Sequence, residues 1–210
     1  MNYIKIFAPA TVANVSCGFD SLGFAVDAIG DEMTFTKTPE KGVEITNITG
    51  ADLTYNIDEN AASAVIKKML NEANADFGIA LTIHKGFSPG SGLGSSAASA
   101  AGAAFGANQL LGEIYSDLEL TKFAMFGEKV ACGSAIADNV AAAIFGGFIL
   151  VRSYEPLEII KLPVPNELRV VAIHPQITIK TKDARDVLPI KIPLKDAVTQ
   201  WANVGGLISG

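Results

Sequence analysis

Residues 88–112, SPGSGLGSSAASAAGAAFGANQLLG, join a loop of glycine, proline and serine to a segment built almost wholly from alanine, serine and glycine. Gly90, Gly92 and Gly94 alternate with other residues, and Ser95 and Ser96 stand where a helix over 96–111 is predicted to begin. Glycine allows backbone angles that turn several amides inward and leaves room for a bulky anion. A helix N-terminus adds unpaired amides and a positive dipole end. The stretch therefore predicts a loop that binds phosphate through backbone amides and serine hydroxyls.

Two other glycine motifs fit this stretch poorly. The nucleotide-binding loop of the G-x-x-x-x-G-K-[ST] type requires a lysine after the glycines, and none follows here. Gly92, Gly94 and Ala97 match the dinucleotide pattern G-x-G-x-x-[GA], but that motif directly follows a strand and opens its domain. Close packing of a core helix would explain the small residues of 96–111, yet not the alternating glycines of the loop.

The composition indicates a folded protein with a substantial core. Of 210 residues, 49% are hydrophobic and 18% charged, which excludes a disordered chain. The net charge of −6 argues against nucleic acid as a partner. The N-terminus lacks the features of a signal peptide, and the apolar run at 140–151 is too short to span a bilayer. Cys17 and Cys132 form no metal or redox motif, so we expect reduced thiols in a cytoplasmic protein.

Hydrophobic periodicity predicts an α+β fold. Strands are expected at 3–9, as a pair within 22–38 turning at Gly30-Asp31, at 42–49, at 77–86, as a hairpin over 148–154 and 157–164, and at 168–175. Helices are expected at 61–75, 96–111, 117–132 and 138–147, with another beginning at 194. That last helix is apolar and would need a sheet to cover it. We therefore expect one domain over 1–164 and the start of an incomplete second domain over 165–210.

The segment PGSGLGSSAASA (89–100) resembles the phosphate loop of the GHMP kinases, the family of galactokinase, homoserine kinase, mevalonate kinase and phosphomevalonate kinase, whose usual form is P-x-x-x-G-L-G-S-S-A. Four further segments resemble the homoserine kinases of that family, in the same order along the chain. They are PATVANVSCGFDSLGFAVD (9–27), GSAIADNVAAAIFGGF (133–148), HPQITIKTKDARDVLP (174–189) and TQWANVGGLISG (199–210).

The resemblance implies a ribosomal-protein-S5-like N-terminal domain followed by a ferredoxin-like C-terminal domain, here truncated, with ATP and substrate between them. It implies phosphorylation of the L-homoserine hydroxyl by ATP and Mg²⁺, in threonine biosynthesis, by a cytoplasmic homodimer. Two alternatives stay open: a related kinase for another small alcohol, and a truncated chain that binds nucleotide without turnover.

The resemblance also assigns the residues that would bind ATP and metal. A loop serine and a helical glutamate ligate magnesium in the family, and these correspond to Ser96 and Glu128. Without the resemblance, Glu128 would be interpreted as a solvated helix charge. The ATP-binding residues would be Pro89, Gly90, Ser91, Gly92, Leu93, Gly94, Ser95, Ser96 and Ala97.

The residues that correspond to the family's substrate site lie outside the loop. Asn14 and Asp20 match in the segment VANVSCGFD, and Thr181 and Arg185 match the arm that binds a carboxylate. A planar guanidinium suits a carboxylate, and Asp20 would hold the ammonium or hydroxyl end. By themselves, Asn14 and Asp20 are typical turn residues between strands.

Asp138 and Asn139 complete the predicted catalytic set with Arg185, and Asp138 also belongs to the substrate site. Either residue could instead cap a helix over 140–145. Asp138 is the candidate if a general base is needed, a point that stays open. The sequence departs from the family's G-S-x-H-x-D-N pattern, because Ile136 stands at the position of the histidine. His84 and His174 are expected to be structural.

Overall fold

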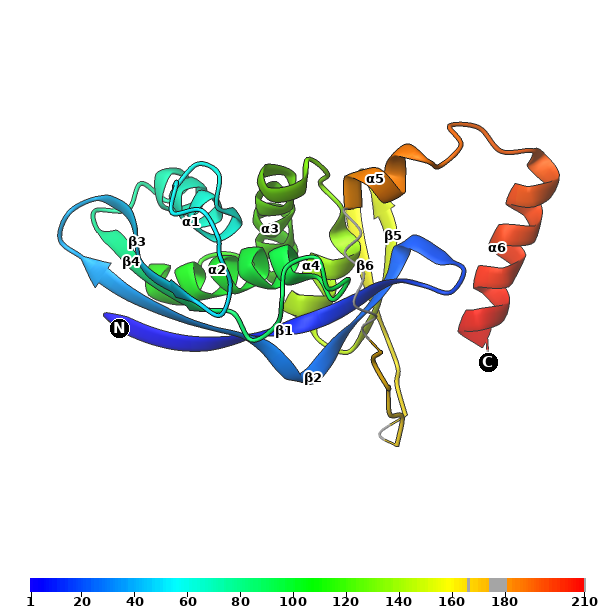
Figure 1. Cartoon of the computed structure of the whole chain (residues 1–210), viewed down its shortest axis with the longest axis horizontal. Coiled ribbons are helices and arrows are strands. Elements are labelled where there is room, and N and C mark those ends of the chain that lie inside the picture. The colour runs from blue at the N-terminus through cyan, green and yellow to red at the C-terminus, as the bar shows by residue number, and fades with distance from the viewer. Residues whose placement is uncertain (166, 174–180, 210) are drawn as a thin grey trace.

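Four helices cover one face of a six-stranded sheet in the computed structural model (Figure 1). The structure describes residues 1–165, 167–173 and 181–209, excluding the side chains of 181–183. The strands are β1 (Tyr3–Val15), β2 (Gly18–Thr38), β3 (Gly42–Thr49), β4 (Gly78–His84), β5 (Phe148–Tyr154) and β6 (Leu157–Leu162). Their order is β3-β4-β2-β5-β6, with β1 paired to β2. β3 and β4 are parallel, and the other pairs are antiparallel. The predicted α+β class is confirmed.

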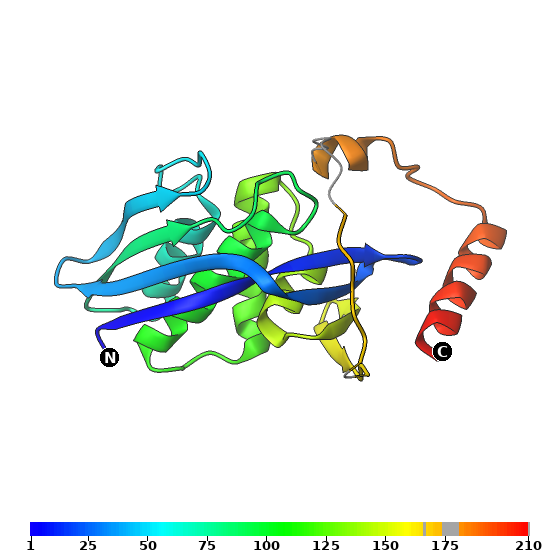
Figure 2. The same ribbon diagram turned by 60° about the horizontal axis from the view of Figure 1, so that its bottom comes forward.

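A single long strand, β2, replaces the predicted strand pair within 22–38, and that prediction is wrong. One edge of β2 pairs with β1 along nearly its whole length, while its other edge pairs with β4 over 32–38 and with β5 over 22–24 (Figure 2). The Gly30-Asp31 dipeptide follows an irregularity rather than a turn. The register of β1 shifts between Pro9 and Ala10 there, and Ala28 has a φ of 65°. β1 also runs beyond the predicted 3–9, because proline is tolerated at an irregularity of an edge strand.

The helices agree closely with the sequence patterns. α1 (Ala61–Glu72) is capped by Asn60, whose side chain accepts from the amides of Ala62 and Ser63. α3 (Asp117–Cys132) begins with a capping box between Ser116 and Glu119. The other two helices on this face are α2 (Ser95–Leu111) and α4 (Ala137–Phe145).

The small residues of α2 allow it to lie close to the sheet. A Cβ at Gly102 would stand 2.6 Å from Sδ of Met33, and one at Gly106 would overlap the ring of Phe35. Met33 and Phe35 are fully buried side chains of β2. Larger residues at these glycines would therefore lift α2 away from the core.

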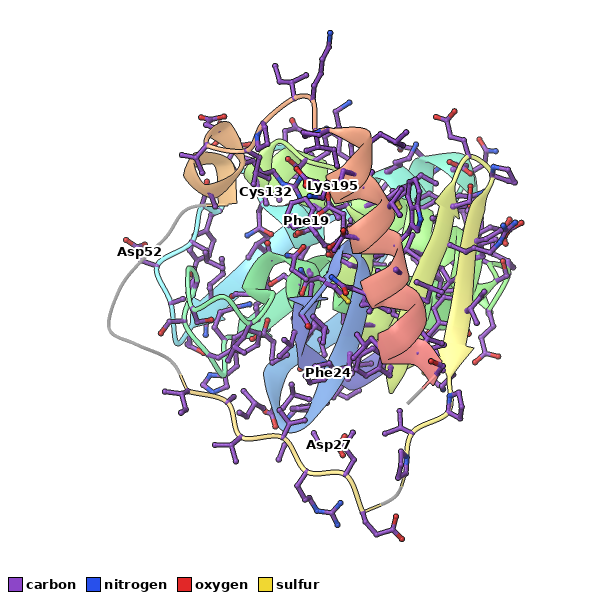
Figure 3. The ribbon with its side chains drawn as sticks, turned by 90° about the vertical axis from the view of Figure 1, so that its right-hand side faces the viewer. Phe19, Phe24, Asp27, Asp52, Cys132 and Lys195 are labelled. Atoms are coloured by element: carbon purple, nitrogen blue, oxygen red, sulfur yellow. The ribbon has the colours of Figure 1, made fainter. Side chains whose placement is uncertain are left out.

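Beyond β6 the chain leaves the sheet. Residues 168–173 form no strand, so the predicted strand at 168–175 is wrong where the structure describes it; 174 and 175 lie outside the described residues. α5 (Thr181–Asp186) and α6 (Leu194–Ser209) follow, and α6 buries none of its residues. The Gln200 side chain donates to the carbonyl of Cys17 at the tip of the β1–β2 hairpin. Figure 3 views this end of the molecule, with α6 in front of the sheet. The predicted domain boundary stays a prediction.

Among the described residues, no helix combines the length and the apolar character that crossing a membrane requires. Cys17 and Cys132 are both free thiols.

Candidate active site

A cavity of about 270 Å³ lies against the predicted phosphate loop and brings most of the predicted residues together. The start of α2, the end of α3, the start of α4, the β1–β2 hairpin and α5 all contribute to its wall. The lining residues are Ala13, Asn14, Pro89, Gly90, Gly92, Gly94, Ser95, Ser96, Glu128, Cys132, Ser134, Ile136, Asp138, Asn139 and Arg185.

The backbone of the loop has the conformation that the glycine spacing predicts. Gly90, Gly92 and Gly94 have φ values of 76°, 75° and 68°, in the left-handed region that side chains disfavour. A Cβ at Gly92 would meet no atom within 4 Å, so this position borders open space. Gly94 is the N-cap of α2, and no side chain caps the helix. The first-turn amides are therefore not capped by any side chain and are available to an anion.

Thr11 of β1 anchors the loop, a role the sequence did not suggest. Its amide donates to the carbonyl of Leu93 at 3.0 Å, and its hydroxyl donates to Oδ1 of Asn139 at 2.7 Å. A Cβ at Gly94 would overlap that hydroxyl. Strand β1, the loop and α4 thus meet at one buried threonine.

A buried ion pair supports the first turn of α2 from below. Lys85, at the end of β4, contacts Asp31 of β2, and its ammonium donates to the Ser95 carbonyl at 2.8 Å and to the Ser99 hydroxyl at 3.0 Å. Lys85 and Asp31 are 3% and 0% exposed. Burial raises the pKa of Asp31 and lowers that of Lys85, and their mutual attraction opposes both shifts. Neither residue was predicted to matter, because Asp31 lies in β2, Lys85 directly follows β4, and only the fold joins them.

Glu128 is a buried carboxylate with an unused oxygen. It is 8% exposed, and its Oε1 has no hydrogen-bond partner within the described chain, so the interpretation as a solvated charge is wrong. Burial raises its pKa, and the neighbouring Ser96 hydroxyl lowers it. The thiol of Cys132 donates to the Glu128 carbonyl at 3.1 Å, and burial raises the pKa of that thiol.

The residues present fit a magnesium ion that takes other ligands from phosphate and water. In the described part of the chain, no three histidine, cysteine or carboxylate side chains cluster to form a complete metal site. Magnesium is commonly held by one or two carboxylates together with substrate phosphates. The orphaned Oε1 of Glu128 beside Ser96 provides such an incomplete site.

Asp138 lies in the first turn of α4 and is 2% exposed. Its Oδ1 accepts from the Asn139 amide at 2.7 Å, and its Oδ2 has no partner among the described residues. Burial raises its pKa from 3.8 to about 6, against the hydrogen bond from Asn139. Neither Asp138 nor Asn139 caps the helix, as had been considered, because α4 begins at Ala137 with Ile136 as its N-cap.

Arg185 of α5 reaches the hairpin and pairs with Asp20. Its Nη1 and Nη2 lie 3.1 and 2.5 Å from the two oxygens of the Asp20 carboxylate. The Phe19 ring lies 5.3 Å from the guanidinium carbon. The Asp20 amide donates to Oδ1 of Asn14 at 3.0 Å, and these two residues have φ values of 55° and 56°. Non-glycine residues with a left-handed backbone conformation are strained, and such residues cluster at functional sites.

Tyr154, at the end of β5, was missed by the sequence analysis. Its hydroxyl donates to the Asp20 carbonyl at 2.9 Å and accepts from the Ala137 amide at 3.3 Å. Burial raises the pKa of Tyr154 to about 12. A strand-end tyrosine carries no local signal of this role, since it joins a hairpin tip to a helix start far away in sequence.

The remaining predicted residues divide into three groups. Ser91, Leu93 and Ala97 do not line the cavity, and Ala97 is fully buried in the core. The side chain of Thr181 and the whole of His174 lie outside the described residues. His84 contacts the Thr49 hydroxyl through Nδ1 at 2.8 Å, which agrees with a structural role.

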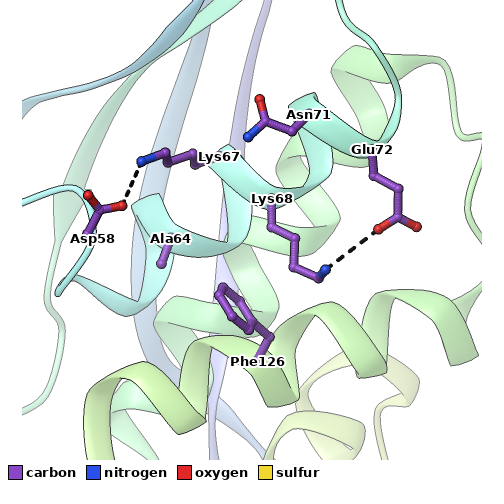
Figure 4. Close-up of a pocket in the computed structure, with 7 residues that line it drawn as sticks. All are labelled: Asp58, Ala64, Lys67, Lys68, Asn71, Glu72 and Phe126. Carbon is purple, nitrogen blue, oxygen red and sulfur yellow. Dashed lines mark hydrogen bonds and ion pairs between the residues drawn. The ribbon is translucent and has the colours of Figure 1, made fainter.

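A second hollow, of about 550 Å³, lies between α1 and α3 and lacks comparable chemistry (Figure 4). Its Lys67 pairs with Asp58 at 2.7 Å and its Lys68 with Glu72 at 3.7 Å, so both cations are already engaged. None of the described residues that line it is a glycine. The phosphate-loop cavity is therefore the candidate active site.

Comparison with known proteins places this chain in a class of phosphoryl-transfer enzymes. Residues 60–147 match the GHMP kinases N terminal domain. The chain is 47% identical, over its whole length, to a homoserine kinase of Chlorobium phaeobacteroides and 44% identical, over 99% of it, to one of Methanococcus vannielii. It spans 69% of each of these relatives.

The same fold is present in a solved structure. The crystal structure of homoserine kinase from Cytophaga hutchinsonii superposes with a TM-score of 0.91 at 50% identity, covering 100% of this chain and 67% of that one. The chain has the GHMP kinase fold, and it belongs to the homoserine kinase family.

Proposed function

We propose that this chain belongs to an enzyme that transfers the terminal phosphoryl group of ATP to the hydroxyl of L-homoserine, giving O-phospho-L-homoserine. One observation carries the proposal: the glycine loop, the Ser96–Glu128 pair and Asp138, whose Oδ2 has no partner in the described chain, all line one cavity. Phosphoryl transfer requires mainly positioning and charge neutralisation, and these groups are suited to both.

The donor side consists of the loop and the start of α2. The amides from Gly92 to Ser96 hold the phosphates of ATP through the geometry of the left-handed glycines. Ser96 and Glu128 would hold Mg²⁺, which when bound neutralises charge on the phosphate oxygens. Glu128 must be ionised for this, so its raised pKa makes metal binding weaken as the pH falls.

The acceptor side consists of Asp138 together with Asp20 and Arg185. The free Oδ2 of Asp138 accepts a hydrogen bond from the hydroxyl that is to be phosphorylated. With its pKa at about 6, this carboxylate is ionised at neutral pH and is able to take the hydroxyl proton. Asn139 acts on the donor side instead, because its oxygen already accepts from Thr11 and so holds the loop.

The wider setting belongs to the same proposal. The product would enter threonine biosynthesis, and the two free thiols support a cytoplasmic location. The proposal also includes an ATP-binding domain that ends near residue 164. Association into a homodimer remains a prediction, and sedimentation velocity tests it.

The test is the incubation of the protein with L-homoserine, ATP and Mg²⁺, followed by ³¹P NMR for the new phosphomonoester. Formation of O-phosphohomoserine that depends on all three supports the proposal. ATP–Mg²⁺ binding without product, measured by calorimetry, would favour a chain that binds nucleotide only.

A second acceptor class is favoured by one residue. Ile136 lines the cavity beside Asp138 and gives that side an apolar wall. A less polar small alcohol would contact this wall well. A panel of small alcohols decides the question: a kcat/KM for any of them above that for L-homoserine would identify the better acceptor.

A further inference from the structure

Lys85 is a buried cation behind the first turn of α2. Its ammonium contacts Asp31 and donates to the Ser95 carbonyl at 2.8 Å and to the Ser99 hydroxyl at 3.0 Å. The side chain is 1% exposed and does not line the cavity, so a ligand in the cavity would not touch it. A buried ion pair is weak evidence for stability, because apolar side chains of similar volume are often at least as stabilising. The position of the pair therefore points to another role.

The Ser95 carbonyl belongs to the same peptide bond as the Ser96 amide. A peptide bond is planar and trans, so an ammonium that holds its oxygen also fixes the direction of its N–H. Amides of a helix point toward its N-terminus, so the Ser96 amide points toward the phosphate loop. Ser96 lines the cavity, and no side chain caps the helix there. A cation at the peptide oxygen also polarises the bond and strengthens its N–H as a donor.

The wall of the cavity carries little positive charge of its own. Residues 86–97 contain no lysine or arginine. Arg185 is the one cation among the described residues that line the cavity, and it is paired with Asp20. A polyphosphate at the loop would therefore depend on backbone amides and on charge behind them. Lys85 provides such charge, since its ammonium attracts the carboxylate of Glu128, which lines the cavity.

We propose that Lys85 is a positioning residue of the phosphate site, which orients and polarises the Ser96 amide through the peptide bond that joins Ser95 to Ser96. The inference rests on the proposed function, because it concerns a polyphosphate bound at the loop. Lys85 strengthens the binding of that polyphosphate from inside the protein, without contact. Its pair with Asp31 is neutral as a whole, so the effect is confined to the first turn of α2 and its surroundings.

Asp31 connects the two ends of the loop over 86–94. One of its oxygens contacts the Lys85 ammonium, which holds the far end at Ser95, and its Oδ1 accepts from the Gly86 amide at 3.2 Å, where the loop begins. A Cβ at Gly86 would overlap the carbonyl oxygen of Gly30, so a glycine lets the loop begin this close to β2. Attraction to Asp31 also opposes the effect of burial on the pKa of Lys85, which favours the charged ammonium.

The experiment measures the binding of ATP and of inorganic tripolyphosphate by calorimetry in EDTA, so that no metal contributes. It compares the wild type with the double variant Lys85→Met/Asp31→Asn. The double variant leaves no buried charge unpaired and should melt near the wild-type temperature. Asp31→Asn also keeps an oxygen for the Gly86 amide, so the loop start is retained. Affinity for both polyphosphates should fall about tenfold, while affinity for adenosine, which has no phosphate, should stay the same.

A second measurement follows the peptide bond itself. In ¹⁵N–¹H spectra without ligand, the amide proton of Ser96 should move upfield in the double variant, because its peptide oxygen has lost the cation. Lys5→Met/Glu32→Gln is the matched control, because it removes an exposed ion pair between β1 and β2 whose Nζ and Oε2 lie 2.7 Å apart. The control should change neither the polyphosphate affinity nor the Ser96 resonance.

The outcomes separate this inference from the proposed function. A folded double variant that binds tripolyphosphate within about twofold of the wild type overturns the inference. An equal loss of affinity for adenosine also overturns it, because the change would then not be specific to phosphate. Polyphosphate binding that depends on Lys85, without phosphorylation of L-homoserine, contradicts the proposed function alone. Absence of ATP binding to the wild type overturns both.

Discussion

Replacing Asp138 by asparagine should alter stability in a way that depends on pH. Burial raises the pKa of this carboxyl from 3.8 in the unfolded chain to about 6 in the fold. The folded protein therefore keeps a proton that the unfolded chain has already released. The resulting stabilisation is complete below about pH 3.8 and is lost as the pH rises through 6.

The magnitude follows from the two pKa values. A change from 3.8 to about 6 corresponds to about 3 kcal/mol, of which about 2 kcal/mol is lost between pH 4.5 and 8. Asparagine does not titrate, so the variant should gain about 2 kcal/mol relative to wild type over that range. Loss of the Asp138 charge also removes one cause of the raised pKa of Glu128, which acts in the same direction.

The assay is urea denaturation of both proteins at pH 4.5, 6 and 8, with the difference between them as the measured quantity. Asp117→Asn, at an exposed position in the first turn of α3, controls for the loss of one negative charge at a helix start. The variant should combine greater stability at pH 8 with loss of turnover, as expected for a strained active-site carboxylate. A stability difference that is constant within about 0.5 kcal/mol across this range would refute the reasoning.

Three further predictions concern the donor side. Lys85→Met should lower the free energy of unfolding by about 3–5 kcal/mol, because it leaves Asp31 buried without its cation. In urea denaturation, the double variant with Asp31→Asn should recover most of that loss; no recovery contradicts the ion-pair argument. Ser96→Ala and Glu128→Gln should each lower turnover about 10–100-fold and raise the Mg²⁺ concentration needed for half-maximal rate. Neither should lower the melting temperature, and Glu128→Gln should raise it at neutral pH, because it removes a buried carboxylate with a raised pKa; equal losses of stability and activity would count against their assignment as ligands. Gly94→Ala should cost at least roughly 1–2 kcal/mol through its left-handed backbone, and the overlap of its Cβ with the Thr11 hydroxyl adds to that cost. The variant should also bind ATP more weakly in calorimetry; unchanged affinity would show that the loop does not need this conformation.

The parts of the fold and site that the sequence predicted are those with local signals. Alternating glycines imply a backbone conformation at their own positions. The helix over 117–132 was predicted from the spacing of its apolar residues, such as Leu120 and Phe123, and its bounds agree with those of α3. Glu128 required the family resemblance. Its burial arises from α2 and α4 packing around α3, which no spacing within α3 reveals.

The parts that were missed depend on contacts between distant segments. Gly30-Asp31 is typical of a turn, and only Lys85, 54 residues beyond Asp31, shows why an aspartate belongs inside a strand. Thr11 lies 128 residues from the Asn139 that it contacts, and Tyr154 lies 134 residues from Asp20. Such residues are ordinary in their local sequence, so periodicity and turn propensity carry no information about them.

The alanine-rich helix α2 has a thermodynamic consequence. Alanine and glycine have no side-chain rotamers to lose, so their ordering in the core proceeds without a side-chain entropy penalty. Since most of α2 consists of such residues, its position against β2 is set by backbone contact rather than by a choice among rotamers. Heating or a core mutation can change which side-chain rotamers are populated elsewhere, but the position of the first amides of α2 relative to β2 should stay the same.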